Sequence, residues 1–362
     1  MRVEKEWGLC FVGFGNVGQG LARLLVKKEQ ELASRWGFSC RTLAVVGKTK
    51  GALVRPEGIG LADLLLRVGR GEPLGSDSVS PVEAALLPGV DMVIDVTPTN
   101  LKDGEPGLSL TRAALEAGRH VVTSDKGPVS LAFPELKKLA EARGCSYRFE
   151  GSVMSGTPSL NLALESLAGC DVLEAKGIVN GTTNYILTRM EDGLEYGEAL
   201  REAMDRGYAE ADPSGDVDGW DAAVKAQILA GVVLGSSLSL SSVNRRGISG
   251  ITKKDVEDAL ARGYRIKLVA KASRAGGTVR ASVAPEEVPL SHPLAGVSGA
   301  TNALTFTTDT LGDVTIIGPG AGREETGQAL LSDMLAIAAG MRNTKRNLIK
   351  QSVFHLLFSY FK

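Results

Sequence analysis

A glycine turn near the start of the chain limits the possible folds more than any other segment. The apolar residues 9–12 are expected to form a buried strand, Gly13, Gly15 and Gly18 follow at the spacing G-x-G-x-x-G, and a helical pattern continues to about Trp36. Glycines at this spacing permit a tight turn and let a pyrophosphate approach the helix N-terminus, where free N–H groups favour negative charge. The segment predicts a dinucleotide-binding turn, and a purely structural turn is the alternative.

Strands and helices alternate after this turn as far as about residue 150. We expect buried strands in RTLAVVG, VDMVIDVTPT and RHVVTSDKG, and helices at 61–69, in SLTRAALEAG and in AFPELKKLAEARG. This alternation is typical of an α/β fold in which helices cover both faces of a parallel sheet. Ligands of such sheets bind at the carboxyl ends of the strands.

The pattern changes beyond residue 150. There, VLEAKGIVNGTTNYILTRM predicts a strand, a turn and a helix, a long helix follows Trp220, and RIKLVAKASR, TVRASVAPEEV and ALTFTTDTLGDVTIIG predict hairpins. These segments predict a second α+β domain. We therefore expect a Rossmann-type dinucleotide-binding domain (1–150), a substrate-binding and dimerisation domain (151–315), a glycine turn and helix that return to the nucleotide domain (316–340), and a basic and apolar tail (341–362).

The composition excludes several classes of partner. The chain has 41 basic and 42 acidic residues, and this net charge of −1 provides no basic field for nucleic acid. Its four cysteines lie far apart without a C-x-x-C pair, which argues against a zinc or redox motif and fits core positions in a reducing cytoplasm. No apolar run approaches about 18 residues, so neither secretion nor membrane spanning is expected. We expect a cytoplasmic protein with a small-molecule partner.

The end of the second expected strand bears on the choice of cofactor. An acidic residue there would hold the ribose 2′-hydroxyl of NAD, whereas cationic residues suit the 2′-phosphate of NADP. The segment VVGKTKGALVR supplies Lys48, Lys50 and Arg55, and the first acidic residue after the strand is Glu57. This favours NADP, with NAD also possible, and a solvated basic loop is the alternative.

Two lysines are the best candidates for proton chemistry. The three histidines, His120, His292 and His355, do not have the placement of a catalytic base. Lys126 follows a strand at the expected carboxyl edge of the sheet, and Lys225 follows Asp221 by four residues, which places both side chains on one helix face. A buried or cation-flanked lysine can exchange a proton with a substrate oxygen. A surface ion pair between Asp221 and Lys225 is the alternative.

The segment AMDRGYAEADPSGDVDGWDAAVK closely resembles the signature of homoserine dehydrogenases. The resemblance extends in order through GFGNVG, DVTPTN, GEPGLSLTRAALEAGRHVVTSDKGP, EGSVMSGTP, NGTTNYILTRM and GPGAGREETGQALLSDM. It implies an enzyme that interconverts L-homoserine and L-aspartate 4-semialdehyde with NAD(P), a step towards threonine and methionine. Another amino-acid dehydrogenase of similar fold and a non-catalytic nicotinamide sensor are the alternatives.

The resemblance also implies roles for individual residues. Lys225 would donate a proton to the aldehyde oxygen, and Lys126 would lie close to both the nicotinamide and the substrate. Glu210 and Asp221 would hold homoserine, with Asp216 as a further candidate. The remaining cofactor contacts would come from the glycine turn, a strand end and a late glycine turn, that is from Gly13, Phe14, Gly15, Asn16, Val17, Gly18, Thr97 and Gly322.

The segment EGSVMSGT resembles the monovalent-cation loop of the family. The Glu150 side chain and the backbone carbonyls of Val153, Ser155 and Thr157 would bind sodium or potassium. The resemblance further implies a homodimer joined through the sheet of the second domain. Because the chain ends about 40 residues after Gly322, we expect no fused regulatory domain.

The last 20 residues, NTKRNLIKQSVFHLLFSYFK, do not match the family. They contain no acid and combine Lys345, Arg346 and Lys350 with the apolar residues Val353, Phe354, Leu356, Leu357, Phe358, Tyr360 and Phe361. A short amphipathic helix docked on its own or a partner subunit, a contact with an anionic membrane surface, and disorder are the alternatives.

Overall fold

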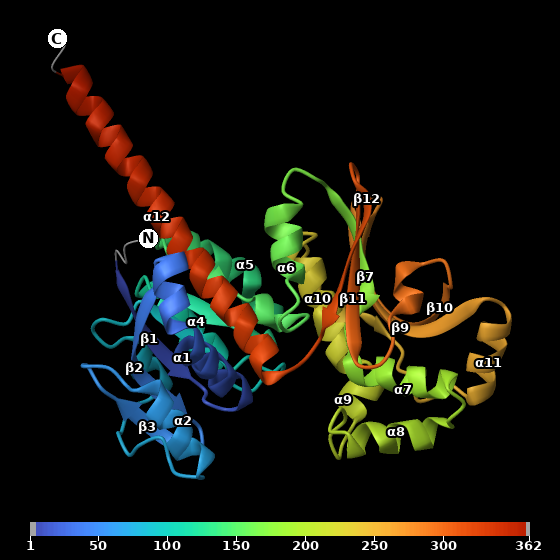
Figure 1. The fold of residues 1–362 in the computed structure, drawn as a ribbon. Helices are drawn as coiled ribbons and strands as arrows, with labels where there is room; N and C mark the ends of the chain where they lie inside the picture. Colours follow the sequence, from blue (N-terminus) through green and yellow to red (C-terminus); the bar gives the residue numbers. More distant parts are fainter. Residues whose placement is uncertain (1–4, 360–362) are drawn as a thin grey trace.

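The computed structural model describes the backbone of residues 5–359 and the side chains of residues 5–341. Two six-stranded sheets form two domains that lie side by side (Figure 1). The first sheet is built from the N-terminal segments and the second from segments after residue 170. The expected α/β domain followed by an α+β domain is confirmed.

The first sheet has the strand order β3-β2-β1-β4-β5-β6, and every neighbouring pair except β2 and β3 is parallel. The expected strands are present, whereas the edge strands β3 and β6, of four and two residues, were not predicted. The strands are β1 (Glu6–Val12), β2 (Ser39–Gly47), β3 (Gly51–Val54), β4 (Met92–Asp95), β5 (His120–Thr123) and β6 (Tyr147–Arg148).

Helices pack against this sheet and place the residues of interest at its carboxyl edge. The helix expected near AFPELKKLAEARG begins earlier, at Lys126, because the Asp125 carboxylate caps it by accepting a hydrogen bond from the Gly127 N–H. This helix is kinked at Ala132, before the internal Pro134. The helices are α1 (Asn16–Trp36), α2 (Leu61–Gly69), α3 (Pro81–Ala85), α4 (Gly107–Glu116) and α5 (Lys126–Ala142).

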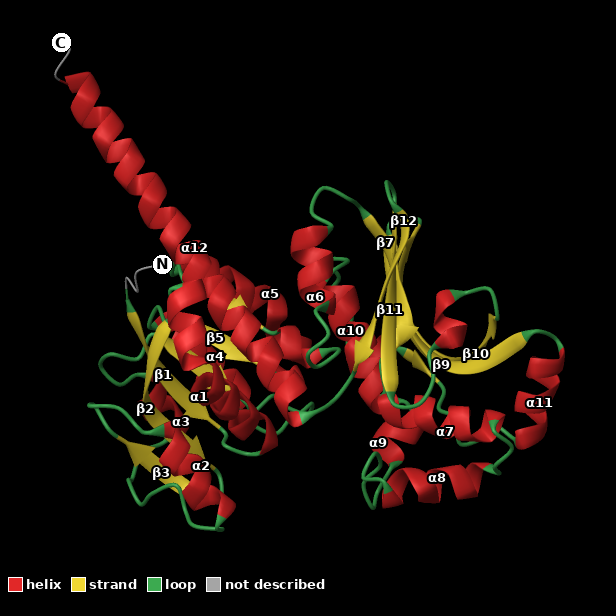
Figure 2. Cartoon of the chain, in the orientation of Figure 1, coloured by secondary structure: helices red, strands yellow, loops and turns green. Residues whose placement is uncertain are grey.

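The second sheet has the order β12-β11-β7-β9-β10-β8, and the expected hairpins are the antiparallel pairs β9–β10 and β11–β12. Figure 2 shows the helices of this domain beside the sheet. Its strands are β7 (Val172–Ile178), β8 (Asn244–Arg245), β9 (Tyr264–Ala275), β10 (Thr278–Pro289), β11 (Thr301–Thr308) and β12 (Gly312–Pro319). Its helices are α6 (Ser159–Asn161), α7 (Gly181–Glu191), α8 (Tyr196–Asp205), α9 (Ser214–Val217), α10 (Trp220–Val232) and α11 (Lys253–Ala261).

Helix α10 forms the centre of the second domain. It lies against β9 and β10 on one side and contacts α5 of the nucleotide domain on another. Ten of its thirteen residues are buried, as expected of a helix that is apolar on most of its faces. Lys225 on this helix is therefore removed from solvent. The sequence pattern alone did not reveal this burial.

The last helix, α12 (Arg323–Ser359), returns to the first domain and lies along α1 (Figure 1). Its apolar residues Leu330, Met334 and Ile337 join the core that contains Leu21 and Leu25. The alternatives for the tail concern side chains beyond residue 341, which lie outside the described residues. Within the described part of the chain, no helix has the length and apolarity needed to cross a membrane.

Candidate active site

The glycine turn has the geometry that binding of an anion requires. Gly13 has a φ of 96°, and a side chain there would collide with the Val96 carbonyl. Gly15 is the N-cap of α1, faces open space and makes no side-chain capping hydrogen bond. Free N–H groups at a helix N-terminus therefore point towards the carboxyl edge of the sheet, where a pyrophosphate can bind.

A cavity of about 940 Å³ lies where this edge meets the second domain. It is lined by both glycine segments, the start of α5, the N-terminus of α7, the acidic segment before α10, and α10 itself. The predicted site residues that it brings together are Asn16, Val17, Lys126, Val153, Ser155, Asp216, Asp221, Lys225 and Gly322.

Asp221 bridges two lysines that come from different domains. Its carboxylate lies 2.7 Å from Lys225 Nζ, one helical turn along α10, and 3.4 Å from Lys126 Nζ at the start of α5. Lys225 is only 7% exposed, so the alternative of a surface ion pair is wrong. The cross-domain contact joins the two lysines that the sequence singled out.

Lys225 is held at both sides of its amine. Nζ donates a hydrogen bond to the Val179 carbonyl at 2.7 Å and one to the Asp221 carboxylate. An ammonium group has three N–H donors, so one remains for a ligand in the cavity that Lys225 lines. This fixed geometry suits transfer of a proton to or from a substrate oxygen.

The charges around Asp221 decide its protonation state. Burial alone would raise the pKa of this carboxyl group, but Lys225, Lys126 and a hydrogen bond from Asn180 outweigh burial and hold the pKa well below its usual range. Asp216 shows the opposite result: burial raises its pKa, and the Asp221 charge adds to the rise. Asp221 is thus a permanent anion beside the two lysines.

Asn180 is a site residue to which the sequence reasoning gave no role. Its Nδ2 donates to Asp216 at 2.6 Å and to Asp221 at 3.1 Å, while its Oδ1 accepts from the Thr183 N–H and caps α7. The quoted segment NGTTN contains an N-cap residue before a helix, which was the available signal. Asn180 thereby orients both carboxylates towards the cavity.

Several predicted residues lie elsewhere. Glu210 is exposed and does not line the cavity, although Tyr208, two residues earlier, does. The Phe14 side chain packs in the core, so only its backbone faces the turn. The Thr97 hydroxyl donates to Asp95 at 2.7 Å, and Thr97 does not line the cavity.

The basic segment after β2 forms a turn between β2 and β3. Lys48 is exposed and Lys50 is half-buried, and no hydrogen bond or ion pair to either side chain is found among residues 5–341. Arg55 is instead paired with Asp77 at 3.2 Å. Two of the three cations are therefore available to a phosphate.

His120 is buried, its Nδ1 accepts from the Ser146 N–H, and burial lowers its pKa to about 4. A neutral, hydrogen-bonded histidine of this kind is structural, as its position at the start of a strand indicated.

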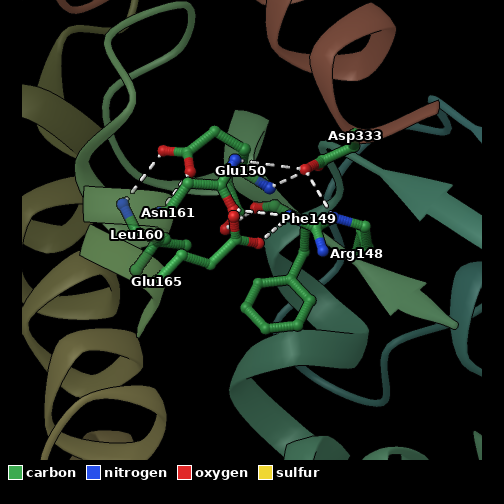
Figure 3. A network of polar contacts seen from close by, with 8 residues as sticks. Arg148, Phe149, Glu150, Leu160, Asn161, Glu165 and Asp333 are labelled. Atoms are coloured by element: carbon green, nitrogen blue, oxygen red, sulfur yellow. Dashed lines mark hydrogen bonds and ion pairs between the residues drawn. The ribbon is translucent and has the colours of Figure 1, made fainter. Parts of the chain in front are cut away.

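The loop expected to bind a monovalent cation joins the two domains. The Glu150 carboxylate is buried and accepts hydrogen bonds from the backbone N–H groups of Leu160 and Asn161 at 3.0 and 2.6 Å (Figure 3). Burial raises its pKa to about 7, although these hydrogen bonds act in the opposite direction. Asp333 of α12 accepts from the Glu150 N–H and from Arg148, which ties the returning helix to this loop.

The oxygen atoms of this loop suit a hard cation in part. No hydrogen bond to the backbone carbonyls of Val153 and Ser155 is found in the described part of the chain, whereas the Thr157 carbonyl accepts from the Ser159 N–H. Ser155 has a φ of 52°, which is uncommon for a residue other than glycine. The same residues form no cluster of three or more His, Cys, Asp or Glu, and the described chain contains none elsewhere.

A strand–glycine turn–helix unit and a lysine pair across a cavity define a nicotinamide-dinucleotide oxidoreductase. Residues 158–335 match the family described as homoserine dehydrogenase. The NAD(+)-dependent homoserine dehydrogenase of Pseudomonas canavaninivorans is 43% identical over 92% of this chain and 96% of its own length. The homoserine dehydrogenase of Methanocaldococcus jannaschii is 37% identical over 91% of this chain and 98% of its own length. The chain belongs to the homoserine dehydrogenase family.

A solved structure gives the same result at the level of the fold. A hyperthermophilic archaeal homoserine dehydrogenase in complex with NADPH superposes with a TM-score of 0.80 at 28% identity, over 93% of this chain and 98% of that one. Relatives of this chain are thus described with NAD(+) in one case and with NADPH in another.

Proposed function

We propose that this protein interconverts L-homoserine and L-aspartate 4-semialdehyde in the synthesis of threonine, methionine and isoleucine. The observation that carries the proposal is the Lys126–Asp221–Lys225 arrangement across the cavity. A bound nicotinamide cofactor supplies the hydride for reduction and accepts it in oxidation. The protein must bind the amino-alcohol, exclude water and move the proton of the oxygen.

Lys225 is the residue proposed to move that proton. In reduction, Nζ gives a proton to the aldehyde oxygen as the hydride reaches the carbonyl carbon, and in oxidation it receives the hydroxyl proton. Asp221 and the Val179 carbonyl keep the amine in one place. Asp221 can do so over the working pH range because its pKa is held well below its usual range.

The acidic residues are proposed to bind the ammonium group of homoserine. Asp216 and Asp221 both line the cavity, and Asn180 orients them. Glu210 belongs to the same set, but its carboxylate is exposed and would reach the substrate only after movement of the segment that carries Tyr208. The Lys126 ammonium is expected to contact both the cofactor and the substrate carboxylate.

We infer a preference for NADP over NAD from Lys48 and Lys50. Both follow the second strand of the nucleotide-binding sheet, where the ribose 2′-position of a dinucleotide is read, and both amines lack an acidic partner in the described residues. Replacing both with glutamine should reduce kcat/KM for NADP by about tenfold and change that for NAD by less than about twofold. Arg67→Gln, on the exposed side of α2, is a control. Equal effects on the two cofactors would contradict the preference.

A sodium or potassium ion is proposed to bind Glu150 and the carbonyls of Val153, Ser155 and Thr157. The carboxylate would supply the charge, and the free carbonyls of Val153 and Ser155 would supply neutral oxygen ligands. The ion would stabilise the loop that joins the domains and takes no part in the chemistry. Thermal stability in potassium or sodium chloride against choline chloride at equal ionic strength tests this site.

A homodimer is proposed to form through the second sheet. Strand β12 lies at one edge of that sheet, and its neighbourhood exposes Leu311 and Ile317 at 59% and 52%. Exposed edge strands of this kind pair with other chains. Light scattering on the purified protein, with Ile317→Lys as the variant, tests the assembly.

The direct test of the activity is formation of NAD(P)H from L-homoserine. The account predicts homoserine-dependent turnover with NADP and slower turnover with NAD. L-Serine and L-threonine, which carry the same functional groups at other spacings, serve as matched substrates. Absence of homoserine-dependent turnover with both cofactors over a range of pH and salt would contradict the proposed function.

A further inference from the structure

Two buried carboxyl groups lie directly behind Lys126. Asp95 ends β4 and has no exposed surface, and Asp125, which follows β5, is 2% exposed. The two strands are paired, with Asp95 opposite Thr123. A side chain at Gly107 of α4 would collide with Asp125 Oδ2 and crowd Asp95 Oδ2, so both carboxyl groups turn towards the same point.

These carboxyl groups are held by neutral donors alone. Asp95 accepts from the Thr97 N–H and hydroxyl at 3.1 and 2.7 Å and from the Thr123 hydroxyl at 3.2 Å. Asp125 accepts from the Gly127 N–H at 2.9 Å and from the Thr97 hydroxyl at 3.4 Å. Neither forms an ion pair with any residue that the structure describes. One Thr97 hydroxyl thus links the two acids.

Two acids in such a place do not both ionise at neutral pH. Burial raises the pKa of Asp125 to about 7, and the Asp95 charge adds to the rise, while Lys126 acts against it. Burial also raises the pKa of Asp95. The Tyr147 hydroxyl of β6 is buried beside them without a partner in the described chain, and its pKa is raised as well. Asp125 therefore takes up a proton as the pH falls through neutrality, and the charge of each carboxyl group disfavours ionisation of the other.

The position of Lys126 makes the charge of Asp125 relevant to the active site. Lys126 is the first residue of α5, where the helix dipole disfavours a cation. Its backbone N–H lies 3.4 Å from Thr99 Oγ1, and the Asp125 side chain caps the same turn. A negative charge on Asp125 offsets the dipole at the residue next to it. The Lys126 ammonium then extends across the cavity to Asp221.

We propose that Asp125 is a positioning residue for Lys126, and that it holds the ammonium against Asp221 only while the Asp125 carboxyl group is ionised. The inference rests on the proposed function, because Lys126 matters only if its cavity binds the substrate and cofactor. It means that the protonation of Asp95 and Asp125 controls activity, although these two residues touch neither the substrate nor the cofactor.

Asp125→Asn tests the proposal without removing the cap, because asparagine is an equally good N-cap residue. We expect kcat/KM for homoserine to fall about tenfold at pH 8.5 and to approach the wild-type value at pH 6, where Asp125 is protonated in the wild type too. Asp103→Asn, in the exposed turn before α4, is the matched control and should leave the profile unchanged. A loss that is equal at both pH values would overturn the proposal.

Asp95→Asn is the second variant, and it should shift the pH dependence of kcat/KM towards lower pH. Removing the neighbouring charge lets Asp125 ionise at lower pH, so the rise of kcat/KM with pH should begin at least about half a pH unit earlier. An unchanged or later rise would overturn the coupling between the Asp95 charge and the ionisation of Asp125.

Thermal unfolding supplies a readout that a structural role would not give. A buried acid whose pKa is raised destabilises the folded state as the pH rises from its unfolded pKa to its folded pKa. Asp125→Asn should therefore raise Tm at pH 8.5 relative to wild type and leave it nearly unchanged at pH 4. A lower Tm at pH 8.5 would overturn the charge assignment. Failure of wild type to turn over homoserine would reject the proposed function, whereas turnover with no pH-dependent difference would reject this inference alone.

Discussion

Lys126 lies between two buried acidic sites whose carboxyl pKa values shift in opposite directions. On one side, Asp221 contacts two lysines and its pKa is held well below its usual range. On the other, Asp95 and Asp125 meet only neutral donors, and burial raises the pKa of Asp125 to about 7. The comparison shows that burial alone makes an acid easier to protonate, and that two cations reverse this outcome. One site supplies a permanent charge and the other a charge that varies near neutral pH.

The largest expected effect comes from removing the permanent charge. Asp221→Ala leaves the Lys225 ammonium buried without its counter-ion, and breaking such a pair costs about 3 kcal/mol of unfolding free energy. Because the pKa of Asp221 is lowered on folding, its contribution is complete above the ordinary carboxyl pKa of about 4 and is lost as the pH falls below it.

Denaturant unfolding at pH 7 and at pH 3 measures this effect. The difference between wild type and Asp221→Ala should be large at pH 7 and should narrow at pH 3. Asp258→Ala, which removes the acid of the exposed i,i+4 pair with Lys254, is the control and should cost less than about 0.5 kcal/mol. If the difference in unfolding free energy between wild type and Asp221→Ala did not depend on pH, the charge of Asp221 would not stabilise the folded protein.

A smaller effect is expected from replacing Asn180, whose side chain donates hydrogen bonds to both Asp216 and Asp221 in the cavity. Asn180→Ala removes the hydrogen bonds to Asp216 and Asp221 and the cap of α7, at a cost of about 1–2 kcal/mol. KM for homoserine should rise about tenfold with a smaller change in kcat, because Asn180 orients the acids that we propose bind the ammonium group. Steady-state kinetics decide this, and an unchanged KM would separate Asn180 from substrate binding.

The smallest effect should come from Tyr147, beside the other acid pair. Its hydroxyl is buried without a partner in the described chain, so Tyr147→Phe should change the unfolding free energy by no more than about 1 kcal/mol, in the stabilising direction. Equilibrium denaturation at pH 8.5 checks the sign. A clear loss of stability would show that the hydroxyl hydrogen-bonds to the acid pair.

The sequence predicted the parts of this molecule that depend on local patterns. The glycine turn, the end of α1 at Trp36, helix 61–69 and the late return helix all have local signals in residue spacing and apolar periodicity. Strand β6 was missed because two residues carry too little periodicity to recognise, and β3 was missed because it lies in the segment interpreted as a basic loop after the second strand. The start of α5 was placed too late because Asp125 was not recognised as its cap.

Contacts within the candidate site could be predicted from residue spacing only where the two residues share a helix. The i,i+4 spacing placed Asp221 beside Lys225, but the burial of that pair depends on how α10 packs between α5 and the second sheet. The contact between Lys126 and Asp221 joins residues 95 positions apart in different domains, and no local pattern encodes it. The pairing of Asp95 with Asp125 likewise depends on the order of strands in the sheet.

Replacement of Lys225 tests the central claim most directly. The claim is that the amine held by Asp221 and the Val179 carbonyl transfers the proton of the substrate oxygen. For Lys225→Ala we predict a fall in kcat for homoserine oxidation of about 10²–10⁴-fold, with the Kd for the nicotinamide cofactor changed by less than about threefold. Lys254→Ala, from the exposed pair with Asp258, should retain wild-type turnover. Wild-type kcat in Lys225→Ala would contradict the account.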